Sequence, residues 1–297
     1  MRYAVLVTGP AGSGKSTFCS SMMTHLQASR RTGHLMNLDP AAEYFEYEPS
    51  IDIRELISLE DTMNELDYGP NGGLIYCFEY LLQNIDWLDE ELGEYEEDYL
   101  LIDCPGQIEL YTHHPLLPSL VKHLNQIGFR TCAVYLLESQ FIEDRYKFFR
   151  LYTTSVFKPS GVLSAMSAMV NLEIPWINIL SKMDLITGGG DSDDPNAARN
   201  GLRKKRDIQR YLEPDPMLLL GGNEETNSNM RFHTLNKAIV QLIEDHPLVQ
   251  FLPLDLTNTD SLENALSHID HVVQYGEDEE PKEPKDLDEG DFPEETE

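Results

Sequence analysis

The sequence predicts an α/β fold, with a mostly parallel sheet and helices on both of its faces. Short, almost wholly apolar runs recur along the chain, as expected of strands that are buried on both faces. Between them lie longer stretches whose apolar residues recur every three or four positions, the period of a helix with one buried face. Strands that alternate with helices form parallel sheets joined by right-handed crossovers.

The first predicted strand, 3–7, is followed by a glycine-rich turn and by a helix over 16–28. In this helix Phe18, Met22 and Leu26 recur at intervals of four and define one apolar face. Further strands are expected at 34–38, 99–102, 131–137, 176–180 and 249–254. Further helices are expected at 56–66, 74–92, 115–127, 144–172 (with Gly161 as a break), 202–212, 232–244 and 260–275.

We expect one domain over 1–275 and an acidic tail over 276–297. The domain carries two helical or loop insertions, at 141–172 and at 187–230. From 277 to 297 the chain holds twelve acidic residues and two lysines, a net charge of −10. Such a segment buries too little apolar surface to offset its ordering entropy, so we expect it to be disordered. It serves either solubility or docking to a basic partner.

The formal net charge of the chain is −30, which disfavours nucleic acid and anionic membrane as main partners. Any bound phosphate must therefore be held locally, by backbone amides, a lysine and a metal ion. The four cysteines form no metal-binding pattern and each lies in an apolar stretch, so we expect buried thiols in a reducing compartment. No secretory leader and no membrane-spanning apolar run is expected.

A phosphate-binding loop is predicted between the first strand and the first helix. Residues 9–16 match the pattern G-x-x-x-x-G-K-[ST] in full, and the flanking strand and helix are the context that this pattern requires. Glycines let successive backbone amides point at phosphates, and the helix adds the positive end of its dipole. Together these features predict a P-loop NTPase. The predicted phosphate-binding residues are Gly12, Ser13, Gly14, Lys15, Ser16 and Thr17, with Ser16 also on Mg²⁺.

Two carboxylates follow strands that should end beside this loop. Asp103 ends the strand at 99–102 and begins a D-x-x-G segment that continues with Gly106 and Gln107. The segment predicts a metal ligand in Asp103, a γ-phosphate contact at Gly106 and a water-orienting side chain in Gln107. Asp39 ends the strand at 34–38 and is expected at the same edge of the sheet, to hold the metal or position water.

A guanine-binding segment is predicted after the strand at 176–180. The run Ser181, Lys182, Met183 and Asp184 is similar to the [NT]-K-x-D pattern. The carboxylate of Asp184 can accept the N1–H and N2–H₂ donors of guanine, which adenine does not offer. Ser181 departs from the usual Asn or Thr; its hydroxyl can tie loops together with one hydrogen-bonding group fewer than asparagine. The segment 251–255 either packs against the base or is an ordinary connection.

The tripeptide Gly69, Pro70 and Asn71 lies between the segments that begin at Asp39 and at Asp103, and the segment at Ser181 follows them. With its motifs in this order, the chain resembles the GPN-loop GTPases over about 1–275, most closely the eukaryotic subgroup numbered three. The resemblance implies a dimer, either a homodimer or a pair with a paralogue. In that dimer Asn71 contacts the γ-phosphate side of the partner's nucleotide, and Gln107 and Glu109 manage water. It also implies GTP hydrolysis with Mg²⁺, and a role in cytoplasmic assembly and nuclear import of RNA polymerase II through its subunits or assembly factors, with possible shuttling to the nucleus.

Two other readings of the motifs stay open at this point. A P-loop kinase would use a lid of basic residues, for which 199–210 is the candidate, and an adaptor would bind nucleotide with little turnover. No arginine of the chain is placed as an arginine finger, which would stabilise the charge of the transition state. Arg54, the nearest candidate, is expected to face solvent. Hydrolysis should then be slow until a partner completes the site. The apolar residues of 141–172 form either a core-facing helix pair or a groove for a client segment.

Overall fold

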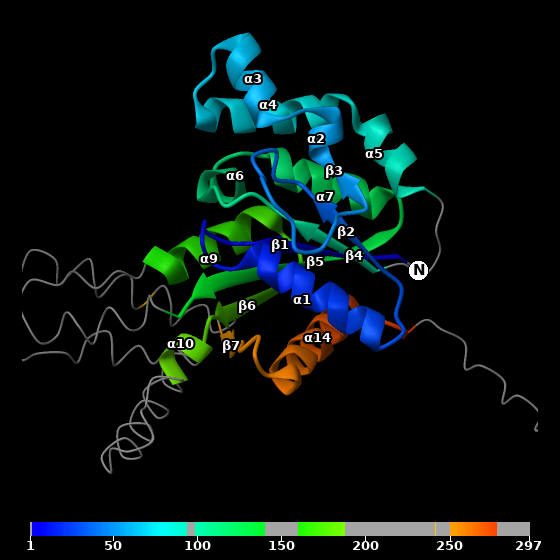
Figure 1. The fold of residues 1–297 in the computed structure, drawn as a ribbon, viewed down its shortest axis with the longest axis vertical. Coiled ribbons are helices and arrows are strands. Elements are labelled where there is room, and N and C mark those ends of the chain that lie inside the picture. Colours follow the sequence, from blue (N-terminus) through cyan, green and yellow to red (C-terminus); the bar gives the residue numbers. More distant parts are fainter. Residues whose placement is uncertain (1, 94–98, 140–159, 188–240, 242–249, 278–297) are drawn as a thin grey trace, which may run out of the picture.

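A computed structural model describes residues 2–93, 99–139, 160–187, 241 and 250–277 of the chain (Figure 1). Within these residues seven strands form one sheet in the order β3-β2-β4-β1-β5-β6-β7, and every neighbouring pair is parallel. The α/β class is confirmed. The strands are β1 Arg2–Thr8, β2 Gly33–Asn37, β3 Ile51–Asp52, β4 Tyr99–Asp103, β5 Phe129–Glu138, β6 Trp176–Ser181 and β7 Phe251–Pro253.

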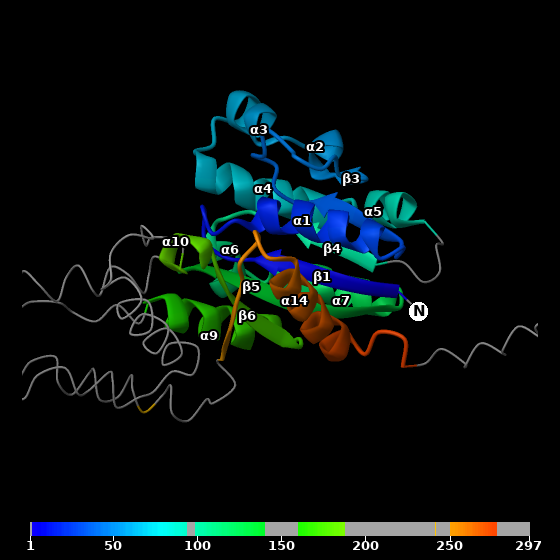
Figure 2. The same cartoon turned by 60° about the horizontal axis from the view of Figure 1, so that its bottom comes forward.

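Helices cover both faces of the sheet, as predicted. Helices α1 and α14 pack on one face, and α4, α5, α6, α7 and α9 pack on the other (Figure 1). Helix α3 packs against α4 on the side away from the sheet, and α2 directly follows the edge strand β3 (Figure 2). The helices are α1 Lys15–Ala28, α2 Ile53–Leu56, α3 Leu59–Leu66, α4 Pro70–Gln83, α5 Ile85–Leu92, α6 Ile108–Thr112, α7 Leu116–Gln126, α9 Ser160–Leu172, α10 Asp184–Thr187 and α14 Thr259–Val273.

The central strand β1 divides the core into two layers. Val5 and Val7 are buried against α1 and α14, whereas Ala4 and Leu6 are buried in the layer under α4 to α7. Successive side chains of a strand point to opposite faces, so a strand covered on both faces is apolar throughout. The predicted apolar face of α1, with Phe18, lies in the first of these layers.

Several details differ from the prediction. Helix α4 begins at Pro70 rather than at residue 74, because proline lacks an N–H and is accepted in the first turn, where that group has no helical partner. The helix expected over 74–92 is two helices that meet at Asn84. Strand β3 and helix α2 were not predicted, because two and four residues are too short to show a period. Gly161 is the second residue of α9; since 140–159 lie outside the described residues, the break expected there stays a prediction.

Most of both insertions lies outside the described residues, and so do the tail from 278 onward and the predicted helix at 202–212. Of the predicted helix at 232–244 only residue 241 is described. In α9, Met166 is buried and Met169 packs against the same core cluster, which favours the core interpretation for that helix. The four cysteines are all free and buried, as expected. None of the helices in the described part of the chain combines the length and the apolar character needed to cross a membrane.

Candidate functional site

The phosphate-binding loop joins β1 to α1 at the carboxyl edge of the sheet. Gly9, Gly12 and Gly14 all have positive φ angles, of 137°, 80° and 89°, in the region that favours glycine. Gly9 also has no room for a side chain, since an added Cβ would lie 2.3 Å from the carbonyl oxygen of Leu136 on β5. The loop therefore requires glycine both for its conformation and for its close contact with β5.

Lys15 is the first residue of α1, at the end of the loop, and is buried. Its Nζ donates a hydrogen bond to the carbonyl oxygen of Pro10 at 3.2 Å. Burial lowers the pKa of Lys15, although Asp103 and Asp39 nearby act to raise it. A phosphate beside Nζ would favour the charged ammonium. This agrees with the role that the motif predicts for Lys15, which is to bind phosphate.

Asp103 and Asp39 lie where neighbouring strands end beside the loop. Asp103 is 6% exposed and pairs in register with Val7 of β1. Burial raises the pKa of Asp103 to about 6, while a hydrogen bond with the Ser16 side chain and the charge of Lys15 act against this rise. Burial likewise raises the pKa of Asp39, opposed by its hydrogen bond from the Ala41 amide and by Lys15. The structure thus brings Ser16, Asp39 and Asp103 together around Lys15.

These oxygen donors fit a Mg²⁺ ion. The Oδ1 atom of Asp103 is buried without a hydrogen-bond partner, a condition that is costly unless a ligand compensates it. Within the described residues no three acidic, histidine or cysteine side chains form an all-protein metal site. Mg²⁺ that accompanies a nucleotide needs only one or two carboxylates, because phosphates and water supply its other ligands.

The D-x-x-G segment lies directly against the phosphate-binding loop. A Cβ added to Gly106 would lie 2.8 Å from the Cα of Ala11, so the two backbones touch. Gln107 is the N-cap residue of α6, with no hydrogen bond from its side chain to the helix, and Glu109 follows in the first turn, exposed. The two predicted catalytic side chains are therefore carried by the start of a helix that adjoins the loop.

Gly69, Pro70 and Asn71 form the exposed N-terminal end of α4. Gly69 is the N-cap residue, and Pro70 and Asn71 occupy the first turn. Among the described residues no hydrogen bond joins Asn71 to the phosphate-binding loop. The segment is therefore accessible from outside the single subunit.

The predicted base-binding segment is tied to the phosphate-binding loop by Ser181. The buried hydroxyl, in a residue 2% exposed, donates to the carbonyl oxygen of Ser13 at 2.7 Å. The shorter side chain thus still joins the two motifs. The Met183 amide donates to the carbonyl oxygen of Leu254 at 3.2 Å, so the chain after β7 packs against this segment.

Lys182 and Asp184 follow at the mouth of the same segment. Lys182 has a left-handed backbone, with a φ of 58°, and its ammonium lies 3.0 Å from the carboxylate of Glu138 at the end of β5. Asp184 is half-buried and is the first residue of α10. Both residues follow β6, which β5 separates from β1 in the sheet, and so lie on the same edge of the sheet as the phosphate-binding loop.

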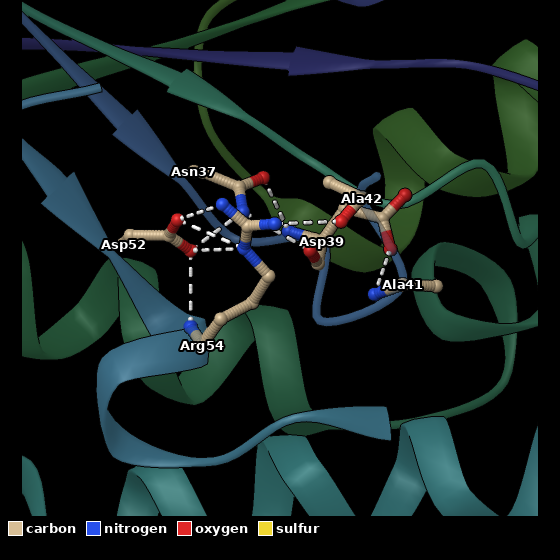
Figure 3. A network of polar contacts seen from close by, with 6 residues as sticks. All are labelled: Asn37, Asp39, Ala41, Ala42, Asp52 and Arg54. Atoms are coloured by element: carbon tan, nitrogen blue, oxygen red, sulfur yellow. Dashed lines mark hydrogen bonds and ion pairs between the residues drawn. The ribbon is translucent and has the colours of Figure 1, made fainter. Parts of the chain in front are cut away.

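Arg54 corrects one expectation and reveals residues that were missed. Its side chain is only partly exposed, at 32%, and its guanidinium forms an ion pair with Asp52 at 2.6 Å rather than projecting freely into solvent (Figure 3). The carboxylate of Asp52 also accepts a hydrogen bond from Asn37, two residues before Asp39. Hydrogen bonds from Arg54 and Asn37 outweigh burial and lower the pKa of Asp52. Asn37 and Asp52 were not predicted as site residues; an aspartate in N-cap position two residues before an arginine is the signal that could have indicated them.

Comparison with known proteins gives consistent matches over nearly the whole chain. A family model described as "Conserved hypothetical ATP binding protein" matches residues 7–275. A protein named GPN-loop GTPase 3 from Mycosarcoma maydis is 62% identical over 294 residues, covering 98% of each chain. Its namesake from Schizosaccharomyces pombe is 55% identical, covering 96% of this chain and 95% of that one. A solved structure of a GTPase in apo form from Pyrococcus abyssi has a TM-score of 0.63 at 24% identity, covering 91% of this chain and 97% of its own, a likeness in fold.

Proposed function

The chain belongs to the GPN-loop GTPase family, and from that premise we propose that it is a molecular switch that binds and hydrolyses GTP. The observation that carries the proposal is the hydrogen bond from Ser181 to the carbonyl oxygen of Ser13. It joins the segment predicted to read the base to the loop predicted to hold the phosphates. The two motifs therefore belong to a single nucleotide site.

The base in this site is the first point to decide, because the family model is described by ATP and the relatives are named for GTP. Asp184 favours guanine on chemical grounds. A carboxylate accepts hydrogen bonds and donates none when ionised, so it pairs with the two donors on the Watson–Crick edge of guanine. Adenine presents an acceptor at N1 and would face this carboxylate unfavourably.

The residues around Lys15 divide the work of phosphoryl transfer. The Lys15 ammonium and the N–H groups of the loop bind the β and γ phosphates. These groups are already in position before the reaction begins. Ser16, Asp103 and Asp39 are the residues to hold Mg²⁺, which supplies further positive charge to the phosphates when bound. Gln107 orients the attacking water. Glu109, two residues further along in the first turn of α6, assists in holding that water.

We propose that the active form is a dimer, with a second copy or with a paralogue. The exposed position of Asn71 supports contact with the nucleotide of the partner subunit rather than with its own. The ion pair of Arg54 with Asp52 supports the same view. Arg54 was the nearest candidate for an arginine finger within the subunit, and its guanidinium is already bound to Asp52. Turnover per subunit should then fall on dilution below the dimer dissociation constant; a rate independent of dilution would refute the dimer.

The cellular role that we propose is cytoplasmic assembly and nuclear import of RNA polymerase II, with subunits or assembly factors of the polymerase as partners and with shuttling to the nucleus. Its support is the family to which the chain belongs. Depletion of the protein should leave RNA polymerase II subunits in the cytoplasm, and the Lys15→Ala variant should not restore their import. Normal nuclear accumulation in depleted cells would refute this role.

The decisive experiment for the site is a titration with fluorescent GTP and ATP analogues, with and without Mg²⁺. Lys15→Ala should abolish Mg²⁺-dependent binding, and the exposed Lys122→Ala on α7 is its control. Asp184→Asn should weaken GTP binding about 10- to 100-fold, the loss of hydrogen bonds to a charged group, with Asp260→Asn at the start of α14 as control. A preference of the wild type for ATP would refute the guanine assignment. Transfer of phosphate to an acceptor would favour the kinase reading, and binding without turnover the adaptor.

A further inference from the structure

A polar network lies behind Asp39 and joins β2, β3 and α2 (Figure 3). Asn37, which is buried, accepts a hydrogen bond from the Asp39 amide at 2.9 Å and donates one to the Asp39 carbonyl oxygen at 3.0 Å. Its amide nitrogen also donates to Oδ1 of Asp52 at 2.9 Å. One side chain thus fixes both backbone groups of Asp39, and Asp52 fixes that side chain.

Arg54 closes this network from the other side. Its Nη2 and Nε atoms donate to Oδ2 of Asp52 at 2.6 and 2.9 Å, and its Nη1 donates to the carbonyl oxygen of Ala42 at 2.9 Å. The guanidinium lies over the ring of Phe45, 4.6 Å from its centroid. Arg54 therefore holds Asp52 and the far end of the turn that starts at Asp39 at the same time.

The turn itself depends on Asp39. The Ala41 amide donates to Oδ1 of Asp39 at 3.0 Å, and the Ala42 amide donates to the Asp39 carbonyl oxygen at 3.1 Å. The direction of the carboxylate is thus set by a turn whose start is held by Asn37 and whose end is held by Arg54. A shift of that turn would move the carboxylate relative to Lys15 and Asp103.

We propose that Arg54 is a positioning residue for Asp39, acting through Asp52 and Asn37 at one end of the turn and through Ala42 at the other. This inference rests on the proposed function, in which Asp39 holds the metal or positions water. A guanidinium is required because its planar fork donates to Asp52 and Ala42 together, whereas a lysine ammonium is a point charge without that geometry. Arg54→Lys should therefore keep the charge and lose the positioning.

The chain contains a matched control for this ion pair. Arg31 contacts Asp270 at 2.6 Å, and its guanidinium lies 4.6 Å from the centroid of the Tyr275 ring. Its side chain is 30% exposed, close to the value for Arg54. Arg31 follows α1 and so lies at the end of that helix opposite to Lys15. Arg31→Lys removes the guanidinium from an equivalent ion pair, keeps the charge, and does not touch the turn at Asp39.

Amide hydrogen exchange tests the positioning without nucleotide or metal. In Arg54→Lys the exchange of the peptide that contains 39–42 should rise by at least tenfold, and in Arg31→Lys it should stay at the wild-type rate. Thermal melting of both variants shows whether their global stabilities differ. Equal exchange of 39–42 in the wild type and in Arg54→Lys would overturn the proposal.

Steady-state GTP hydrolysis tests the consequence. A misplacement of the order of 1 Å can lower a rate by about 10²-fold, so kcat of Arg54→Lys should fall about 10- to 100-fold while KM changes less than about threefold. A fall no larger than that of Arg31→Lys would overturn the proposal.

Chemical rescue separates positioning from folding. Arg54 lines an open pocket of about 360 Å³ together with Phe45, Glu48, Pro49, Asp52 and Glu55, so a small cation can reach Asp52. In Arg54→Ala, guanidinium at millimolar concentration should restore part of kcat and of the exchange protection, and methylammonium should restore neither. Rescue by both cations alike would refute the need for the fork. If the wild type hydrolyses no GTP, the proposed function fails, whereas raised exchange in Arg54→Lys still upholds the contact between Arg54 and the turn.

Discussion

Asp103→Asn should make the metal-free protein more stable. The folded chain holds this carboxylate 6% exposed, with one oxygen that has no hydrogen-bond partner. Burial raises its pKa from 3.8 to about 6, against the hydrogen bond with Ser16 and the charge of Lys15. Asparagine has nearly the same shape, is neutral at every pH and can still accept a hydrogen bond from Ser16.

The magnitude follows from the two pKa values. Each unit by which the pKa in the folded state exceeds that in the unfolded state corresponds to about 1.4 kcal/mol. A rise from 3.8 to about 6 therefore lowers the free energy of unfolding by about 3 kcal/mol at pH 8, where the carboxylate is charged in both states. Because the pKa is raised in the folded state, the free energy of unfolding falls as the pH rises. The contribution of Asp103 to stability is fully present below pH 3.8 and is lost as the pH rises through 6. The gain from Asp103→Asn should thus be about 3 kcal/mol at pH 8 and about half of that at pH 5.

Urea unfolding in the presence of EDTA measures this gain, at both pH values and for both proteins. Glu263→Gln, an exposed residue of α14, is the control and should change the free energy of unfolding by less than about 0.5 kcal/mol. The same Asp103→Asn variant should lose Mg²⁺-dependent nucleotide binding, so that stability rises as function falls. A variant that is destabilised at pH 8, or equally stabilised at both pH values, would refute the reasoning.

Two further substitutions test the contacts between motifs. Ser181→Ala removes the hydrogen bond to Ser13 and should lower the free energy of unfolding by about 1–2 kcal/mol and weaken GTP binding; Ser181→Thr keeps the hydroxyl and should bind GTP as the wild type does, as urea unfolding and titration would show. Gly106→Ala forces a Cβ to within 2.8 Å of the Ala11 backbone and should slow GTP hydrolysis at least about tenfold. Gly33→Ala is its control, because the nearest atom there, at 3.0 Å, is the flexible end of a side chain; equal rates for the two variants would argue against a role for the contact at Gly106.

The long strands could be predicted because the sheet is covered on both faces. Burial on both sides demands apolar residues without interruption, as in β1 and β4, and such runs are visible in a sequence. Strand β3 gave no such signal, since only Ile51 and Asp52 pair with β2. The start of α4 was missed for another reason: Gly69 and Pro70 are typical of turns, and also of a helix that begins with proline.

The segments expected to bind phosphate, metal and base could be located in the sequence because each is a short motif that follows a predicted strand; their roles stay predictions. The network around Arg54 could not, because it depends on pairing between strands. Asn37 and Asp52 are fifteen positions apart and become neighbours only through the register of β2 with β3. Without β3 in the prediction, Arg54 had no acidic partner and was assigned to solvent.

The position of Gly69, Pro70 and Asn71 on α4 has a consequence for how two subunits would associate. A flexible loop that becomes ordered in an interface loses about 1–2 kcal/mol of backbone entropy per residue. Here Pro70 and Asn71 already belong to the first turn of a fourteen-residue helix, with Gly69 as its N-cap residue, and the φ of Pro70 is restricted by its ring before any encounter. Most of that entropy is therefore lost during folding of the single subunit, which leaves more of the contact energy for affinity between the two chains.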